Sequence, residues 1–238
     1  MNKAAYDDVA DWYDECIRNG TLLSASNLIM AVIIDLTGNV RGRRVCDLAC
    51  GQGIVAREIA RCGANVVGVD LSQKLLEIAR REEAAEPLGV EYIHDDVQSL
   101  MAIESDEFDV VVCNMALMDI EDLNSTARSV KRILHAGGWL VISITHPCFQ
   151  LPPSRAYDVE GFWKSDNPHG VRGRVGAYHR TLSTYVNAFI HAGLVLEQII
   201  EPQAPDRNTP AILVAKYVNR LSDKLSPPET QRVRSYAT

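Results

Sequence analysis

The chain has 238 residues, 47% of them hydrophobic and 23% charged, which is enough apolar material for one α/β domain with a small addition. The formal net charge is −7 and lysine and arginine form no cluster, which argues against a surface built for nucleic acid, although it does not exclude RNA. The chain starts with polar and acidic residues, and the apolar run at 22–36 is too short and interrupted to span a bilayer. We therefore expect a cytoplasmic protein without membrane contact.

The six cysteines form no Cys-x-x-Cys pair. Three of them, Cys46, Cys50 and Cys113, lie in or beside apolar runs typical of strands, so we interpret them as buried thiols in a reducing compartment. A metal site is the alternative, but the spacing of the cysteines is not that of zinc ligands. The sequence therefore predicts no metal site.

The first part of the chain predicts helices over 4–18 and 21–37, separated by Asn19 and Gly20. Strands and helices then alternate. We expect strands at 43–49, 65–71, 90–96, 108–115 and 139–146, and helices at 53–62, 73–86 and 123–134. Ser72 is the expected cap of the second of these helices, and Gly137 and Gly138 are expected to close the third. This alternation indicates a parallel sheet with right-handed crossovers.

The alternation stops at residues 147–178, which contain four prolines, several glycines and aromatic residues. Long connections of this kind often form binding loops. A helix is expected at 182–193, followed by strands at 194–202 and 211–218 with no helix between them, so these two strands should be antiparallel. We divide the chain into an N-terminal helical segment 1–38, a main domain 39–220 with an insertion at 147–178, and a polar tail 221–238 that we expect to be loosely held.

A glycine turn, Gly51-Gln52-Gly53, lies between the first strand and the following helix, where backbone amides are free to meet a ligand. Asp70 ends the second strand and is placed to accept the hydroxyls of a ribose. A dinucleotide and S-adenosylmethionine both fit this combination. Asp47 favours S-adenosylmethionine, because a carboxylate attracts its ammonium and sulfonium and repels a pyrophosphate. The pattern ending at Ala56 also satisfies the loose dinucleotide fingerprint.

Five segments in order resemble the Rossmann-like (class I) S-adenosylmethionine-dependent methyltransferases: "VCDLACGQG", "VVGVDLS", "HDDVQSL", "FDVVVC" and "LHAGGWLVISI". The chain is most similar to the small-molecule branch that includes ubiquinone- and menaquinone-type enzymes. The resemblance implies a doubly wound, mostly parallel seven-stranded sheet with an antiparallel last strand, an N-terminal helical lid and an insertion after strand 5. It also implies S-adenosylmethionine as cofactor and S-adenosylhomocysteine as product.

The same resemblance implies the residues around the cofactor. The ribose carboxylate would be Asp70, and Asp96 with the amide of Val97 would meet the adenine edge, with Asp95 as a neighbour that could share that role. The expected cofactor-binding residues are Tyr13, Asp47, Ala49, Gly51, Gly53, Asp70, Leu71, Asp95, Asp96, Val97, Asn114 and Met115. Four of them have a simpler interpretation: Asp47 and Asp96 as caps, Asp70 as a solvated strand-end acid, and Tyr13 as an anchor of its helix.

Methyl transfer from a sulfonium mainly needs alignment, so a universal catalytic residue is not required. His146 at the end of the fifth strand and His179 after the insertion are candidate general bases, with a structural hydrogen bond as the alternative for each. Met118, Tyr157 and Trp163 are candidate acceptor-binding residues, with core packing as the alternative. The (N/D)PP(Y/F) motif of amino-methylating enzymes is absent.

The sequence therefore predicts a methyltransferase acting on O, N or C of a small organic acceptor. The alternatives are a methyltransferase of RNA or protein, a cofactor-binding relative without transferase activity, and a dinucleotide oxidoreductase. The acceptor is not identified, and the oligomeric state stays open between a monomer and a homodimer.

Overall fold

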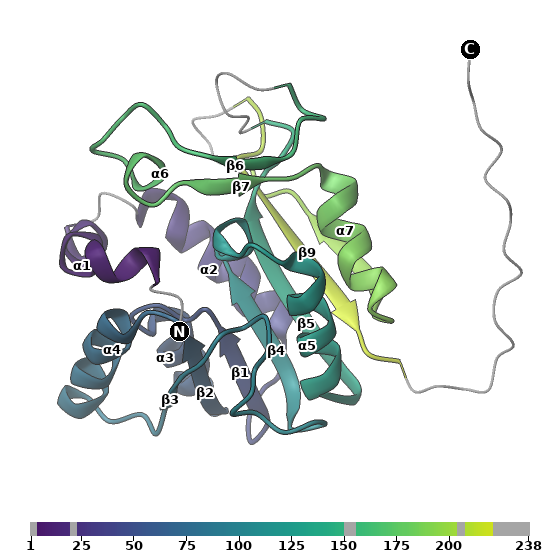
Figure 1. The fold of residues 1–238 in the computed structure, drawn as a ribbon. Helices are drawn as coiled ribbons and strands as arrows, with labels where there is room; N and C mark the ends of the chain where they lie inside the picture. Colours follow the sequence, from purple (N-terminus) through teal and green to yellow (C-terminus); the bar gives the residue numbers. More distant parts are fainter. Residues whose placement is uncertain (1–3, 20–22, 150–155, 204–207, 221–238) are drawn as a thin grey trace, which may run out of the picture.

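The computed structural model describes residues 4–19, 23–149, 156–203 and 208–220. Its centre is a seven-stranded sheet with the order β3-β2-β1-β4-β5-β9-β8 (Figure 1). The strands are β1 (Arg44–Leu48), β2 (Asn65–Asp70), β3 (Glu91–His94), β4 (Phe108–Asn114), β5 (Leu134–Thr145), β8 (Val195–Ile200) and β9 (Ile212–Val218). The strands β1 to β5 pair in parallel, and β9 is antiparallel to both β5 and β8. The predicted Rossmann-like fold with an antiparallel last strand is confirmed.

Helices cover both faces of the sheet, as expected for parallel strands that are apolar on both sides. On one face pack α2 (Leu23–Thr37), α3 (Ile54–Arg61) and α4 (Gln73–Ala85), and on the other α5 (Leu123–Ile133) and α7 (Leu182–His191). Ile33, Ile59 and Leu76 are fully buried on the first face, and Val130 and Phe189 on the second. The core is therefore two apolar layers, one on each side of the sheet.

The strand order reverses between β1 and β4, which are neighbours in the sheet although β2 and β3 follow β1 in the chain. In open α/β sheets a crevice forms at such a reversal, outside the carboxyl ends of the strands. The loops after β1, β2 and β4 all leave the sheet at that edge. The fold thus places the glycine turn, Asp70 and Asn114 around one crevice.

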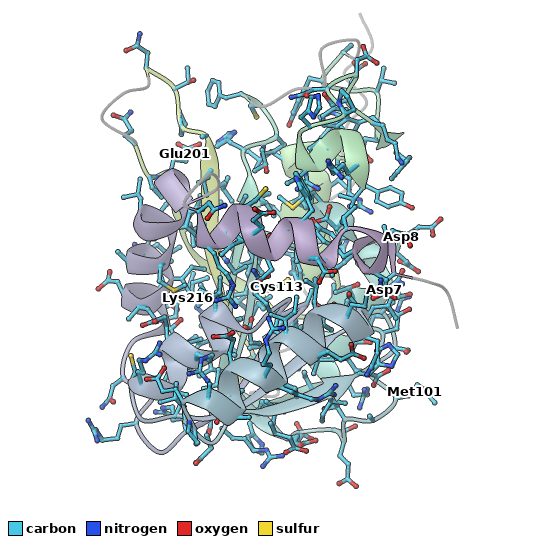
Figure 2. The ribbon with its side chains drawn as sticks, turned by 90° about the vertical axis from the view of Figure 1, so that its left-hand side faces the viewer. Asp7, Asp8, Met101, Cys113, Glu201 and Lys216 are labelled. Atoms are coloured by element: carbon cyan, nitrogen blue, oxygen red, sulfur yellow. The ribbon has the colours of Figure 1, made fainter. Side chains whose placement is uncertain are left out.

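Two added segments lie over this edge (Figure 1). The N-terminal cover, residues 5–18, comprises the 3-10 helix η1 (Ala5–Asp8) and α1 (Ala10–Arg18). The insertion hairpin, residues 161–179, comprises β6 (Gly161–Trp163), α6 (Val171–Arg174) and β7 (Ala177–His179), with β6 and β7 antiparallel. A short 3-10 helix after β4, η2 (Leu117–Asp119), lies between the two. Figure 2 views the molecule from the side of the N-terminal cover, whose purple ribbon crosses the front with Asp7 near its beginning.

One element boundary differs from the prediction. The helix α5 ends at Ile133, and β5 begins at the next residue, so Gly137 and Gly138 lie inside a strand and do not close a helix. Four residues, 135–138, stand opposite the single residue 109 of β4, which makes an irregular bulge. A Cβ on Gly138 would lie 2.6 Å from the backbone oxygen of Asp109. Gly138 therefore serves a close approach between two strands, whereas Gly137 has φ of 84°, in the left-handed region.

The remaining boundaries agree with the prediction to within a few residues. Ser72 caps α4 through its hydroxyl, which accepts a hydrogen bond from the Leu75 amide at 3.2 Å. Cys46 and Cys113 are fully buried, and the six cysteines are free thiols. The tail 221–238 lies outside the described residues. Within the described ranges, no helix has the length and apolar character needed to cross a membrane.

Candidate active site

A cavity of about 700 Å³ occupies the crevice at the carboxyl ends of β1, β2 and β4. This volume is in the range of sites for small molecules and cofactors. Its wall is formed partly by the sheet edge and partly by the N-terminal cover and the insertion hairpin. Of the expected cofactor-binding residues, the wall contains Tyr13, Asp47, Ala49, Gly51, Asp70, Leu71, Asp96, Val97, Asn114 and Met115.

Two residues at the glycine turn have a left-handed backbone and line the cavity. Ala49 and Gly51 have φ of 52° and 55°, in the left-handed region. The amide of Gly51 donates to Oδ2 of Asp70 at 2.7 Å, which ties the turn after β1 to the end of β2. Gly53 has φ of 83° and begins α3, but it does not line the cavity. A Cβ there would collide with the hydroxyl of Tyr92, so this glycine is needed for packing.

Asp70 is buried at the cavity wall and is held by two backbone amides. Its Oδ2 accepts from Gly51 and its Oδ1 accepts from Ser72, each at 2.7 Å. Burial raises the pKa of this carboxyl, and these two hydrogen bonds work in the opposite direction. Two carboxylate oxygens offer about four acceptor positions, so room remains for two ribose hydroxyls.

Asp47 is the least satisfied carboxylate of the cavity. It is 1% exposed, and its Oδ2 has no hydrogen-bond partner among the described residues. Burial raises its pKa to about 8. The hydrogen bond from the Ala56 amide acts to lower this pKa, and the charge of Asp70 acts to raise it. A buried carboxylate without a partner is costly, unless a cation or donor meets it. The free acceptor position on Asp47 thus fits the ammonium group of an amino-acid cofactor.

The loop after β3 separates the two neighbouring aspartates. Asp96 lines the cavity, and its carboxylate accepts from the amide and the side chain of Gln98 at 2.9 to 3.1 Å. Asp95 lies outside the cavity wall, where its two oxygens accept from the amides of Asp96 and Ala102, each at 2.7 Å. The structure therefore places Asp96 in the cavity wall and gives Asp95 a role in shaping the loop.

The residues after β4 are fixed by Ser143 on the neighbouring strand. The Ser143 hydroxyl donates to the side chain of Asn114 at 2.7 Å and accepts from the amide of Met115 at 3.0 Å. Met115 has φ of 53°, a further left-handed residue of the cavity wall. Met118 is 4% exposed in the core and is not part of the wall. Core packing is therefore the interpretation that fits Met118.

The two candidate bases are not brought into the cavity, which corrects the expectation that they face it. His146 is 1% exposed; its Nε2 lies 2.6 Å from the Glu201 carboxylate (labelled in Figure 2), and its Nδ1 accepts from the Cys148 amide. The Nε2 of His179 lies 2.8 Å from the carbonyl oxygen of Tyr157. Both rings are used in joining the insertion and the C-terminal strands to the fold.

Two aromatic residues of the insertion hairpin lie in the cavity wall. Phe162 and Tyr178 line the cavity, face each other across β6 and β7, and have ring centroids 5.2 Å apart. Trp163 packs against the core, and the Tyr157 hydroxyl accepts from the Leu182 amide, so neither lies in the wall. Successive residues of a strand point to opposite faces, so a pattern of period two would have distinguished Phe162 from Trp163.

A group of polar residues in the wall had no signal in the sequence. Asp119 at the end of η2 accepts from the Tyr6 hydroxyl at 3.2 Å and is ion-paired with Arg172 of α6. Glu121 stands nearby on the rim. These residues come from three distant parts of the chain, so only the tertiary structure shows that they form one group.

Comparisons with known proteins agree with this geometry. Residues 46–142 match the family described as a methyltransferase domain. The chain is 34% identical over 134 residues to a ubiquinone biosynthesis O-methyltransferase of Bordetella avium, covering 56% of each protein. It is 33% identical over 162 residues to a demethylmenaquinone methyltransferase of Clavibacter sepedonicus, covering 66% of this chain and 62% of that protein. The matches thus span less than two thirds of these curated relatives.

Among solved structures, an S-adenosylmethionine-dependent methyltransferase from Mesorhizobium loti is similar over 79% of this chain and 96% of its own. The two chains are 29% identical, with a TM-score of 0.68. The family model begins in β1 and ends in β5. The family uses S-adenosylmethionine as cofactor, and the buried, unpartnered Asp47 oxygen and the Gly51 turn suit that molecule. In residues 46–142 and in its fold, the chain is therefore similar to the Rossmann-like (class I) S-adenosylmethionine-dependent methyltransferases.

Proposed function

We propose that this chain transfers the methyl group of S-adenosylmethionine to O, N or C of a small organic acceptor. The observation that carries the proposal is the buried Asp47 carboxylate, which has an oxygen without a partner in the described part of the chain and lines the same cavity as Gly51 and Asp70. A cationic amino-acid group would satisfy that oxygen, whereas a pyrophosphate would be repelled.

In this proposal the sheet edge holds the three parts of the cofactor. Asp47 and the Gly51 turn bind the amino-acid end, Asp70 binds the ribose hydroxyls, and Asp96 with Val97 meets the adenine. Leu71 packs beside the adenine ring. All of these residues line one cavity, which supports the assignment.

When bound, S-adenosylmethionine supplies an activated methyl group on a sulfonium. The task left to the protein is to align the acceptor, and orientation of this kind can lower a barrier by roughly 7–11 kcal/mol. Asn114 and Met115 lie at the end of β4, where the cofactor and the acceptor would meet. Because His146 and His179 are engaged elsewhere, a proton lost by the acceptor would pass to solvent and not to these rings.

The acceptor would lie beneath the insertion hairpin, against Phe162 and Tyr178. An aromatic wall of this kind suits a flat or apolar molecule. The names of the curated relatives refer to ubiquinone biosynthesis and demethylmenaquinone. For this chain we propose only a small organic acceptor, without a nucleic-acid partner, in the cytoplasm. The six free thiols and the acidic net charge support the last two points.

Calorimetric titration with S-adenosylmethionine, S-adenosylhomocysteine, NAD and NADP tests the proposal. We expect micromolar binding of the two sulfur ligands and no binding of the nicotinamide ligands. Binding of NAD or NADP alone would replace the proposal by an oxidoreductase. Sulfur-ligand binding without transfer to any of a panel of phenols, amines and carboxylic acids would favour a cofactor-binding relative.

A further inference from the structure

The N-terminal cover and the insertion hairpin are separated by about 150 residues in the sequence, yet both lie over the cavity and contact each other. Each also has its own attachment to the rest of the molecule. The question is whether the two segments can move independently of each other.

The first connection between them runs through one carboxylate. Asp119 Oδ2 accepts from the hydroxyl of Tyr6 in the N-terminal cover at 3.2 Å, and Oδ1 pairs with Nη1 of Arg172 in the insertion hairpin. The Asp119 side chain is 19% exposed and the Arg172 side chain 24%, so the pair is shielded from water. A shielded, charge-assisted pair is stronger than one on the open surface.

The second connection does not involve Asp119. The guanidinium of Arg174 lies over the ring of Trp12, with 4.1 Å between its Cζ and the ring centroid. Within the cover, Tyr6 and Tyr13 pack edge to face at 5.2 Å, which joins η1 to α1. Both arginines belong to the single turn α6, so this short element contacts the cover directly through Arg174 and is linked to it through Asp119 of η2 by Arg172.

The attachments to the domain lie on different halves of the cavity. The Asp7 carboxylate of the cover accepts from the Ser72 hydroxyl at 2.7 Å and the Lys74 amide at 3.2 Å, close to Asp70 in the chain. The insertion hairpin continues into Arg180, whose guanidinium donates to backbone oxygens of Leu117, Ile120 and Glu121 around η2. The cover is therefore anchored beside the ribose position, and the hairpin beside η2.

We infer that the N-terminal cover and the insertion hairpin open and close as one unit, joined through α6, so that the cofactor half and the acceptor half of the cavity are coupled. A ligand that favours the closed cover then also favours the closed hairpin, and the effect is reciprocal. Asp119 and Arg172 act as positioning residues in this unit. The identity of the two ligands rests on the proposed function, whereas the joint movement is a property of the chain itself.

Hydrogen exchange of the full chain without any ligand tests the joint movement. The test variant is Y6F/W12L, which removes one hydroxyl and one cation–π contact and keeps apolar side chains in both places. The control is E15Q on the same helix, because Glu15 is exposed and lies outside the cavity wall. We expect amides of residues 161–179 to exchange roughly five- to tenfold faster in Y6F/W12L than in the wild type. The control should leave their exchange unchanged.

The reverse variant, R172Q/R174Q, should accelerate exchange in residues 5–18 by a similar factor. Faster exchange in the mutated segment alone, or in neither segment, overturns the inference, because the two segments would then open separately. The outcome does not depend on the proposed function. If the proposed function were wrong, the wild type would not bind S-adenosylhomocysteine. The hydrogen exchange of the two segments in the variants would still be as expected above.

Discussion

On the cofactor half of the cavity, the functional side chains leave the ends of β1, β2 and β4, whereas on the acceptor half they come from two segments added to the sheet. Asp47, Asp70 and Asn114 are held by backbone amides or by a neighbouring strand. Asp119, Arg172 and Tyr6 are held by one another. The cofactor half can therefore persist without the N-terminal cover and the insertion hairpin. The acceptor half exists only when both segments are in place.

The largest effect is expected for Asp70→Ala, which breaks the cofactor half. It removes a charged acceptor for two hydroxyls and releases the Gly51 amide. Hydrogen bonds to charged groups contribute about 1.5–3 kcal/mol each, so the affinity for S-adenosylhomocysteine should fall at least about 100-fold. Calorimetry measures this. Glu91→Gln, at an exposed carboxylate outside the cavity wall, is the control and should stay within about twofold; unchanged affinity in a folded D70A would remove the ribose assignment.

Asp47→Asn should weaken cofactor binding about tenfold at pH 8 and abolish its pH dependence. In the free protein burial raises the pKa of Asp47 to about 8, and a bound ammonium would lower it, so binding releases a proton. Wild-type affinity for S-adenosylhomocysteine should therefore rise as the pH increases from 6 to 8. Titrations at three pH values check this, and a flat wild-type profile would argue against the contact between Asp47 and the ammonium.

The same substitution should stabilise the unliganded protein. A carboxyl with a raised folded pKa favours folding while it is protonated, and this contribution declines as the pH rises from about 4 through about 8. At pH 8 the amide that replaces the Asp47 carboxylate carries no charge to bury, so we expect a Tm about 2–4 °C above that of the wild type. Thermal unfolding at pH 5 and pH 8 measures the difference, which should be smaller at pH 5.

Tyr178→Leu and Phe162→Leu test the acceptor half. Each removes an aromatic surface from the cavity wall, so KM for an acceptor should rise about tenfold while S-adenosylhomocysteine affinity changes less than twofold. Trp163→Leu is the matched comparison in the same hairpin. Because Trp163 packs on the core, it should lower Tm and leave KM unchanged. Equal effects of all three on KM would contradict the assignment of faces.

The smallest effects on turnover are expected for His146→Gln and His179→Gln. Both rings are engaged away from the cavity, so kcat should stay within about threefold of the wild type. Loss of a buried hydrogen bond should instead reduce the free energy of unfolding by about 1–3 kcal/mol. Steady-state kinetics together with denaturant unfolding separates a catalytic role from a structural one. A 100-fold loss of kcat in a variant of unchanged stability would show that the histidine is catalytic.

Much of the cofactor half was predictable because its signals are local. A buried strand, a glycine turn and a helix in succession place Asp47 and Gly51 at one edge of a parallel sheet, whatever the rest of the chain does. Gly53 was less predictable, since only the position of Tyr92, about forty residues later, shows that a side chain has no space there. Gly138 was equally hard to predict, because the backbone oxygen of Asp109 that leaves no space for a side chain there belongs to another strand.

The amino-acid sequence by itself determined the sheet, its alternation with helices and the carboxylates at its edge, since hydrophobic periodicity and turn residues act over a few positions. Only the tertiary structure decided which aromatic residues face the cavity, that His146 and His179 turn away from it, and that Asp119 joins Tyr6 to Arg172. Those choices depend on contacts between segments far apart in the chain, and a sequence carries no local record of such contacts.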